Sequence, residues 1–199
     1  NDRQTLSPKL QLVLADADDD YDAIPHIDQT ARDLTRSQLF QPLTPKDEAS
    51  RVNLGLDHEL NYKDRLTSRF FIGQSYNLSD EDFDMRSGFG EDRSALITEA
   101  ALYAGALSLT QQARFSDDGS ALLRSDSKMA LAFEAFNIGF DHSFYEAGQT
   151  GSNADNPLEE ATGRLGWQMS QNWRLDASLR ENLEEKERVR ADAAFTYED

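Results

Sequence analysis

The chain has 199 residues, no cysteine and a formal charge of −17, with 20 Lys and Arg against 37 Asp and Glu. The absence of cysteine excludes a disulfide scaffold and a cysteine-based zinc site, and the acidity argues against binding to nucleic-acid phosphates. No run of about 18 apolar residues is present, so the sequence predicts no transmembrane helix. Because the chain begins at Asn1 and stops within an alternating pattern at 195–199, we expect it to be a piece of a longer protein.

Apolar and polar residues alternate with a period of two along most of the chain, which is typical of β-strands. The first predicted strand lies near 8–15, with Leu10, Leu12 and Leu14 on one face. About nine more follow between 50 and 197, so that about ten strands are predicted, longer than the ordinary five to six residues. In each strand one face is apolar and the opposite face is polar, as in Trp173 to Leu179, where the intervening residues are Arg174, Asp176 and Ser178.

The predicted connections alternate between short and long. Short turns fall near 63–64, 105, 134–135 and 170–172, and longer polar loops near 79–93, 116–120, 148–157 and 184–186. This alternation, with one apolar face per strand, is typical of outer-membrane β-barrels. The sequence therefore predicts an all-β fold, an antiparallel transmembrane β-barrel arc that is a fragment of a larger barrel, spanning 1–199. We expect an aromatic girdle near the short turns, formed by Tyr62, Tyr103, Phe133, Phe136 and Trp173.

The segment 15–49 does not alternate, and we interpret it as a large external loop, a length that often indicates function. It contains three prolines and an acidic cluster, namely Asp16, Asp18, Asp19, Asp20 and Asp22. The cluster does not fit a calcium-binding EF-hand, because Tyr21 takes the place of the required glycine and Ile27 that of the closing glutamate. We therefore interpret it as a solvated loop, which leaves open whether the cluster shares divalent ions with lipid phosphates.

No catalytic constellation is recognisable. His26, His58 and His142 are too dispersed for a zinc motif, Ser75 lacks the second glycine of a nucleophile elbow, and Gly88-Phe89-Gly90 lacks the third glycine of a dinucleotide loop. The sequence predicts no enzyme activity, no cofactor and no metal site.

Several short motifs carry a family resemblance. They are Ile24-Pro25-His26-Ile27-Asp28, Ser37-Gln38-Leu39-Phe40, Arg51-Val52-Asn53-Leu54-Gly55-Leu56, Ile72-Gly73-Gln74-Ser75-Tyr76 and Asn172-Trp173-Arg174-Leu175. In this order they resemble the C-terminal barrel half of LptD, the lipopolysaccharide-assembly family of the Gram-negative outer membrane. The matching motif positions are Ile24, Pro25, Asp28, Leu39, Phe40, Gly73, Gln74 and Tyr76. The stretch 41–47 departs from the family pattern, and His26 stands where the family more often has Asn.

The resemblance implies lipopolysaccharide transport and assembly at the outer leaflet of the cell outer membrane, without enzyme activity. It also implies the partners lipopolysaccharide, an LptE-like lipoprotein plug and, through the parent protein, a periplasmic LptA-like bridge. This arc would contribute wall, lumen lining and external loops, while the lateral opening between the first and last strands of the parent barrel would lie elsewhere.

Strand parity predicts a set of charged residues that face the lumen, and their role in steering a phosphorylated glycolipid is a hypothesis. The set comprises Arg69, Arg164, Arg174, Arg190, Asp176 and Asp192, together with Arg180 and Asp141. Two alternatives stay open at this point, a passive porin- or receptor-type outer-membrane barrel and a soluble β-sandwich binding module.

Overall fold

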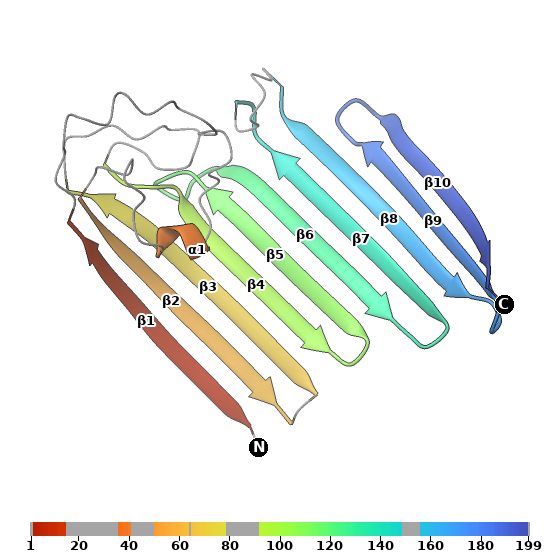
Figure 1. Cartoon of the computed structure of the whole chain (residues 1–199). Helices are drawn as coiled ribbons and strands as arrows, with labels where there is room; N and C mark the ends of the chain where they lie inside the picture. The colour runs from red at the N-terminus through yellow and green to blue at the C-terminus, as the bar shows by residue number, and fades with distance from the viewer. Residues whose placement is uncertain are drawn as a thin grey trace, which may run out of the picture.

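A computed structural model describes residues 2–14, 36–40, 50–63, 65–78, 92–148 and 156–198. Within these residues the chain forms one antiparallel sheet of ten strands, in which every strand pairs with its neighbours in sequence (Figure 1). The strands are β1 Arg3–Val13, β2 Arg51–Tyr62, β3 Leu66–Asn77, β4 Leu96–Ala104, β5 Leu107–Phe115, β6 Leu122–Ala132, β7 Phe136–Tyr145, β8 Leu158–Gln168, β9 Trp173–Asn182 and β10 Glu187–Tyr197. A single helical turn, α1, spans Arg36–Leu39.

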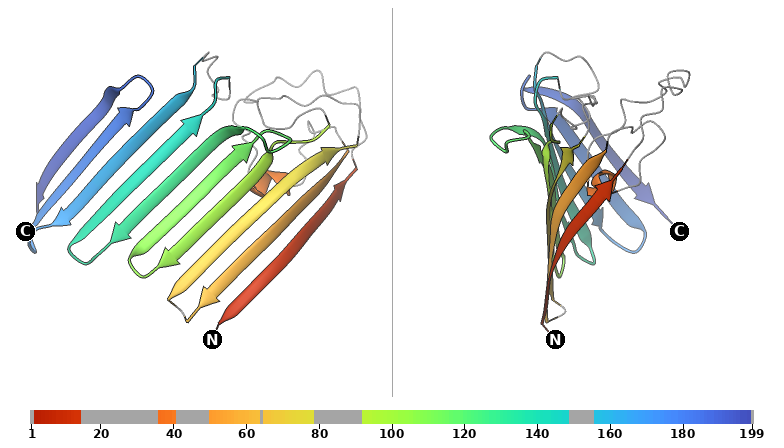
Figure 2. Two further views of the ribbon diagram at one scale, coloured as in Figure 1. Left: turned by 180° about the vertical axis from the view of Figure 1, so that it is seen from behind. Right: turned by 90° about the vertical axis from the view of Figure 1, so that its left-hand side faces the viewer.

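The sheet has one apolar and one polar face, because the pairing register keeps the alternation of neighbouring strands in phase. Leu10 pairs with Leu54 on the apolar face, whereas Lys9 pairs with Gly55 on the polar face. Apolar side chains on the first face are exposed, with Leu10 at 74% of its surface. The edge-on view in Figure 2 shows a single layer of strands with α1 on one side only. The apolar face therefore has no second protein layer over it among the described residues.

Short turns lie at one end of the sheet and the longer connections at the other end (Figure 1). The short connections that follow β2 and β4 begin with a residue in the left-handed backbone region, Lys63 with φ of 49° and Gly105 with φ of 56°. On the apolar face near this end, Phe133 and Phe136 lie 4.7 Å apart and Trp173 stacks on Phe195 at 4.6 Å between ring centroids. No helix among the described residues is long and apolar enough to cross a membrane.

Two sequence-based expectations about position differ from the structure. Tyr103 pairs with Thr67 and Ser108 on the polar face, so its place in an aromatic girdle was wrong. Its neighbour Leu102 takes the outward position, and the period of two then turns Tyr103 inward. The first strand, expected near 8–15, begins at Arg3, since its polar first residues pair with β2 as regularly as its leucines do.

The buried apolar cluster lies on the polar face, toward the long-loop end. It consists of Leu39, Phe71, Ala95 and Ile97, with Phe40 and Leu123 packed against it. Leu39 is fully buried and Phe71 is 1% exposed, although the other side chains that β3 places on this face, such as Thr67, Arg69 and Ser75, are polar. The cluster exists because α1 covers this part of the face, so a segment between β1 and β2 in sequence packs over β3 and β4.

Candidate functional site

The five motif positions that the structure describes converge on the long-loop half of β3. Leu39 and Phe40 approach β3 from the polar face, Gly73 lies beneath them, and Gln74 and Tyr76 follow directly along the strand. Ile24, Pro25 and Asp28 lie outside the described residues, as does the acidic cluster 16–22. We call the convergence around β3 the β3 junction and describe its polar-face side first.

Two glycines form the seat of α1. Gly55 on β2 pairs directly with Gly73 on β3, so this part of the polar face has no side chains for two adjacent positions. A Cβ at Gly73 would lie 2.5 Å from Phe71 Cζ and 2.7 Å from Leu39 Cδ2, and a Cβ at Gly55 would lie 2.8 Å from Phe40 Cζ. Any larger residue at either position therefore displaces the rings or α1 itself.

Charged and polar contacts hold α1 on this seat. Arg36 pairs with Asp57 at 2.8 Å, and its guanidinium lies 5.2 Å from the centroid of the Phe71 ring. The backbone N–H of Arg36 donates to Glu99 Oε1 at 3.2 Å. Lys9 also pairs with Asp57, at 2.9 Å. Residues 36–40 therefore contact β2 to β4 through Arg36. They also contact β1, because the ammonium of Lys9 lies 5.5 Å from the centroid of the Phe40 ring.

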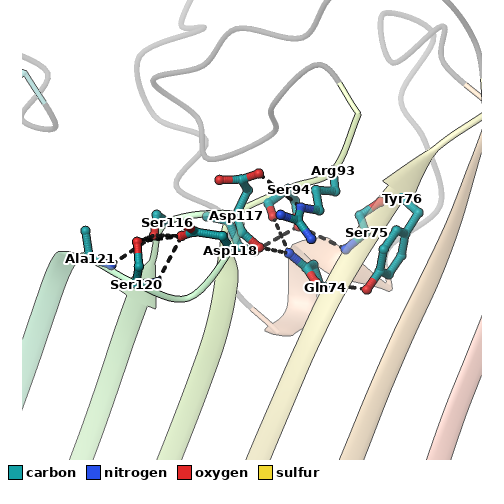
Figure 3. Close-up of polar contacts among 11 residues, drawn as sticks. Gln74, Ser75, Tyr76, Arg93, Ser94, Ser116, Asp117, Asp118, Ser120 and Ala121 are labelled. Carbon is teal, nitrogen blue, oxygen red and sulfur yellow. Dashed lines mark hydrogen bonds and ion pairs between the residues drawn. The ribbon is translucent and has the colours of Figure 1, made fainter.

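On the other side of the β3 junction, Gln74 joins two connecting segments (Figure 3). Its side-chain amide donates to the carbonyl of Ser94 at 2.9 Å and to that of Asp117 at 2.6 Å. Tyr76 in turn donates its hydroxyl to Gln74 Oε1 at 3.0 Å. Gln74 is 9% exposed, and a buried amide that satisfies two carbonyls fixes the segments that carry them.

The loop from β5 to β6 is held by its own aspartate. Asp118 accepts hydrogen bonds from the hydroxyl groups of Ser116 and Ser120 and from the backbone N–H of Ser120. These bonds favour the carboxylate and lower the pKa of Asp118 to about 2. Beside it, Arg93 pairs with Asp117 at 3.0 Å, which raises the pKa of Arg93. The loop therefore keeps its charges and its shape at neutral pH (Figure 3).

The eight charges predicted to face the lumen all lie on the polar face. Arg69 pairs with Glu59 at 3.2 Å, Arg174 with Asp176 at 2.7 Å, and Arg190 with Asp192 at 2.5 Å, while Arg164 pairs with Asp141. Sequence reasoning did not identify Glu59 or Glu160, the partner of Arg180. Their strand parity is the signal that identifies them.

A cavity of about 340 Å³ lies on the polar face beside α1. Its charged lining residues are Arg36, Arg69, Glu99, Asp126 and Lys128, and Phe71 and Tyr103 supply aromatic surface. Arg36 and Arg69 have the acidic partners described above, whereas Lys128 has no ion pair among the described residues. No group of three or more His, Asp or Glu suited to a metal ion occurs in the part of the chain that the structure describes.

Of the two histidines that the structure describes, His142 is the one with a carboxylate partner. It lies on the apolar face between Phe140 and Phe144, and its Nε2 lies 2.9 Å from Glu159 Oε1. His58 shares that face and contacts Gln4 at 2.9 Å, while His26 lies outside the described residues. The described histidines are thus separate and form no common site.

Comparison with protein-family models matches residues 2–173 to the LptD model, described as LPS transport system D. A comparison with curated proteins finds no match. The family match covers β1 to β8, α1, the first residue of β9 and the eight motif positions named above. A two-faced antiparallel sheet with an exposed apolar side is what the wall of such a membrane barrel requires. The chain therefore belongs to the LptD family, which transports and assembles lipopolysaccharide in the outer membrane and is not an enzyme family.

Proposed function

We propose that the polar face lines the conduit along which lipopolysaccharide passes, and that the apolar face contacts the membrane lipid. The observation that carries this proposal is the segregation of two exposed faces. One presents exposed leucines and aromatics such as Leu10 and Phe195, and the other presents paired charges such as Arg174 with Asp176. Barrels that enclose an aqueous lumen have this polar-in and apolar-out pattern.

The sheet is open within the described residues, and we propose that it is one arc of a larger closed barrel. β1 and β10 pair with a neighbour on one side only in this sheet. Unpaired backbone N–H and C=O groups are not tolerated against hydrocarbon, so other strands of the parent protein are expected to cover both edges. In this arrangement residues 1–199 supply wall, lumen lining and external loops.

The charged wall beside α1 supports a role in guiding the phosphorylated glycolipid. Arg36, Arg69 and Lys128 line the same cavity as the aromatic rings of Phe71 and Tyr103. Cationic groups attract phosphate, whereas apolar surface accepts the part of an acyl chain nearest the headgroup. Since Arg36 and Arg69 already pair with carboxylates, Lys128 is the cation with the most capacity to meet a passing phosphate.

Photocrosslinking in the full-length protein tests the path. A photoreactive amino acid at Thr110 lies on the polar face and lines the cavity, and the matched control at Leu109 is its neighbour on the apolar face of the same strand. Lipopolysaccharide should crosslink at both positions during growth. When lipopolysaccharide synthesis is blocked, the signal at Thr110 should disappear while that at Leu109 persists, because the membrane already contains the lipid.

The opposite pattern would contradict a lumenal path. If Thr110 captures no lipopolysaccharide while synthesis continues, the polar face does not line the path. If the Thr110 signal outlasts the block as the Leu109 signal does, the contact is with resident lipid and not with lipid in transit.

For partners, we propose that an LptE-like lipoprotein plug covers the bare part of the polar face and that an LptA-like bridge acts through the rest of the parent protein. The polar side chains of β8 to β10 support the first part, because no described segment covers them and those of β10 are exposed, as the 73% exposure of the Arg190 side chain illustrates. A photoreactive residue at Ser178 should capture the lipoprotein, and the same residue at Leu179, on the apolar face, should not.

A further inference from the structure

The apolar face is interrupted on four neighbouring strands. In the pairing register, Gln111 on β5 lies beside Ser127 on β6, and Ser127 lies beside His142 on β7. These polar residues occupy the same face as Leu109, Met129 and Phe140. Ser125 and Glu159 extend the interruption along β6 and β8. We call these five residues the outward polar strip.

The strip is bonded across the strands. Gln111 donates its amide N–H to Ser125 Oγ at 2.8 Å, and the Ser127 hydroxyl donates to Gln111 Oε1. His142 Nε2 lies 2.9 Å from Glu159 Oε1, and their side chains are 28% and 37% exposed. These pairings lower the free-energy cost of placing polar groups on this face. The paired side chains nevertheless remain in contact with whatever lies against the face.

From β5 to β8, the outward polar strip runs from the middle of the membrane-spanning part of the sheet to the external boundary of that part. Gln111 is the third outward-facing residue of β5 counted from the short-turn end, His142 is the fourth of β7, and Glu159 is the last of β8. The row of paired residues that is third from the short-turn end on β5 is therefore fourth on β7, so it changes depth from strand to strand. The outward polar strip is therefore continuous with the water-exposed end of the sheet at Glu159.

Its hydrogen-bonding capacity exceeds the bonds made within the strip. A carboxylate has a second oxygen, an imidazole a second nitrogen, and a hydroxyl a further lone pair. In a hydrocarbon layer such groups need water or the polar parts of lipid molecules as partners. A narrow strip that opens to the external boundary admits both from that side, whereas its flanks, such as the 43% exposed Phe140, require acyl chains.

We infer that the headgroup layer of the outer-leaflet lipid, with its water, dips along the outward polar strip to about the middle of the wall and thins the membrane beside β5–β8. The occupant is lipid and not a second membrane protein, because the strip is only one or two residues wide on each strand and is continuous with the membrane boundary. This inference rests on the family's outer-membrane location and is independent of the proposed lumenal path.

An environment-sensitive fluorescent amino acid at Ala113 in the full-length protein tests it, in vesicles of phosphatidylethanolamine and phosphatidylglycerol. Ala113 is the fourth outward-facing residue of β5 and pairs with Ser125. Ala191 is the fourth of β10, where the outward run of Tyr197, Phe195 and Ala193 is free of polar residues, and it serves as the depth-matched control. The probe at Ala113 should show red-shifted emission and strong iodide quenching. At Ala191 it should show blue-shifted emission and quenching by lipids with brominated acyl chains.

A variant that removes the strip on β5 and β6 provides the second arm. Combining Gln111→Leu, Ser125→Ala and Ser127→Ala should move the Ala113 probe toward the Ala191 behaviour, with heat-modifiable mobility used to verify folding. If the triple variant does not fold, the comparison of Ala113 with Ala191 in the parent sequence still decides. Blue-shifted, bromolipid-quenched emission at Ala113 in the parent sequence overturns the inference. Protection of that probe from both quenchers also overturns it, because a protein partner then covers the strip.

Discussion

Gly55 and Gly73 lie directly opposite each other on β2 and β3, and the space above them is filled by the rings of Phe40 and Phe71. The pair shows how an apolar segment is seated on a face that is otherwise polar. Without side chains at these two positions, the backbone of the wall itself forms the floor of the seat.

Gly73→Ala should release α1. The added Cβ would approach Phe71 and Leu39 within 2.7 Å, and overpacking of this kind typically costs about 1–3 kcal/mol. Limited proteolysis of the full-length protein should show faster cleavage near residues 36–40. Gly163→Ala is the matched control, because it is also a strand glycine but a Cβ there meets nothing within 4 Å. Equal cleavage rates in the two variants would contradict the conclusion that Gly73 provides the space in which α1 packs.

Asp57→Asn should loosen the same segment by another route. Asp57 is the shared partner of Arg36 and Lys9, so neutralising it removes two ion pairs at one position. Cleavage at 36–40 should accelerate, although less than in Gly73→Ala, since the Lys9 and Arg36 side chains are 38% and 39% exposed and such pairs contribute about 0–1 kcal/mol each. Asp176→Asn, which removes an exposed pair remote from α1, should leave the cleavage rate unchanged.

Gln74→Ala should separate the segments at 92–95 and 116–121. Two carbonyls, of Ser94 and Asp117, lose their donor, and an unsatisfied buried acceptor costs about 1–3 kcal/mol. The midpoint of the heat-modifiable mobility shift should fall. Gln168→Ala removes an amide that reaches only Ser170 within its own exposed turn, and it should not change the midpoint.

Asp118→Asn should increase amide exchange at Ser120 at neutral pH, because the Ser120 N–H donates to the Asp118 carboxylate. The pH dependence follows from the lowered pKa of Asp118, about 2 against the ordinary 3.8. A lowered folded-state pKa stabilises the loop above the ordinary value, and this contribution is lost as the pH falls from about 4 to about 2. Protection of Ser120 should therefore be constant from pH 7 to pH 5 and decline below pH 4.

An Asp117→Asn variant separates the two neighbouring carboxylates. It removes the ion pair with Arg93 but leaves the bonds that Asp118 makes with Ser116 and Ser120. Unchanged Ser120 protection in this variant, with loss in Asp118→Asn, assigns the effect to Asp118. Equal loss in both would show that the loop depends on Arg93 instead.

The strands were predictable from sequence because a wall with two environments imposes a period of two on every strand. Residues that break this pattern through tertiary contacts were not predictable in the same way. Phe71 and Ile97 are apolar on the polar face because α1, distant in sequence, covers them. Gln111 and Ser127 are polar on the apolar face and bond to each other across β5 and β6, a relationship that appears only once the register is known.

The motif positions show the same division. Family resemblance singled out Leu39, Phe40, Gly73 and Gln74, but not what they do together. The opposition of Gly55 and Gly73 needs the register of β2 and β3, and the two acceptors of Gln74 lie on segments far from it in sequence. Only the polar-face charges followed from parity alone, and their partners Glu59 and Glu160 could have been found by the same count.

The strictly sequential order of the sheet determines how the chain assembles. Each hairpin from β2 to β10 closes over a connection to its immediate neighbour, and only β1 and β2 must meet across the long segment 14–50. The free-energy cost of closing a loop grows slowly, by about 0.6 kcal/mol for each doubling of its length. The length of the segment 14–50 therefore adds little to the cost of pairing β1 with β2, and its main effect is to make that pairing late. The surface on which α1 packs forms only when β2 and β3 have paired with Gly55 opposite Gly73. Docking of α1 is therefore a late step, and a chain whose hairpins have formed in the wrong register has nowhere to place it.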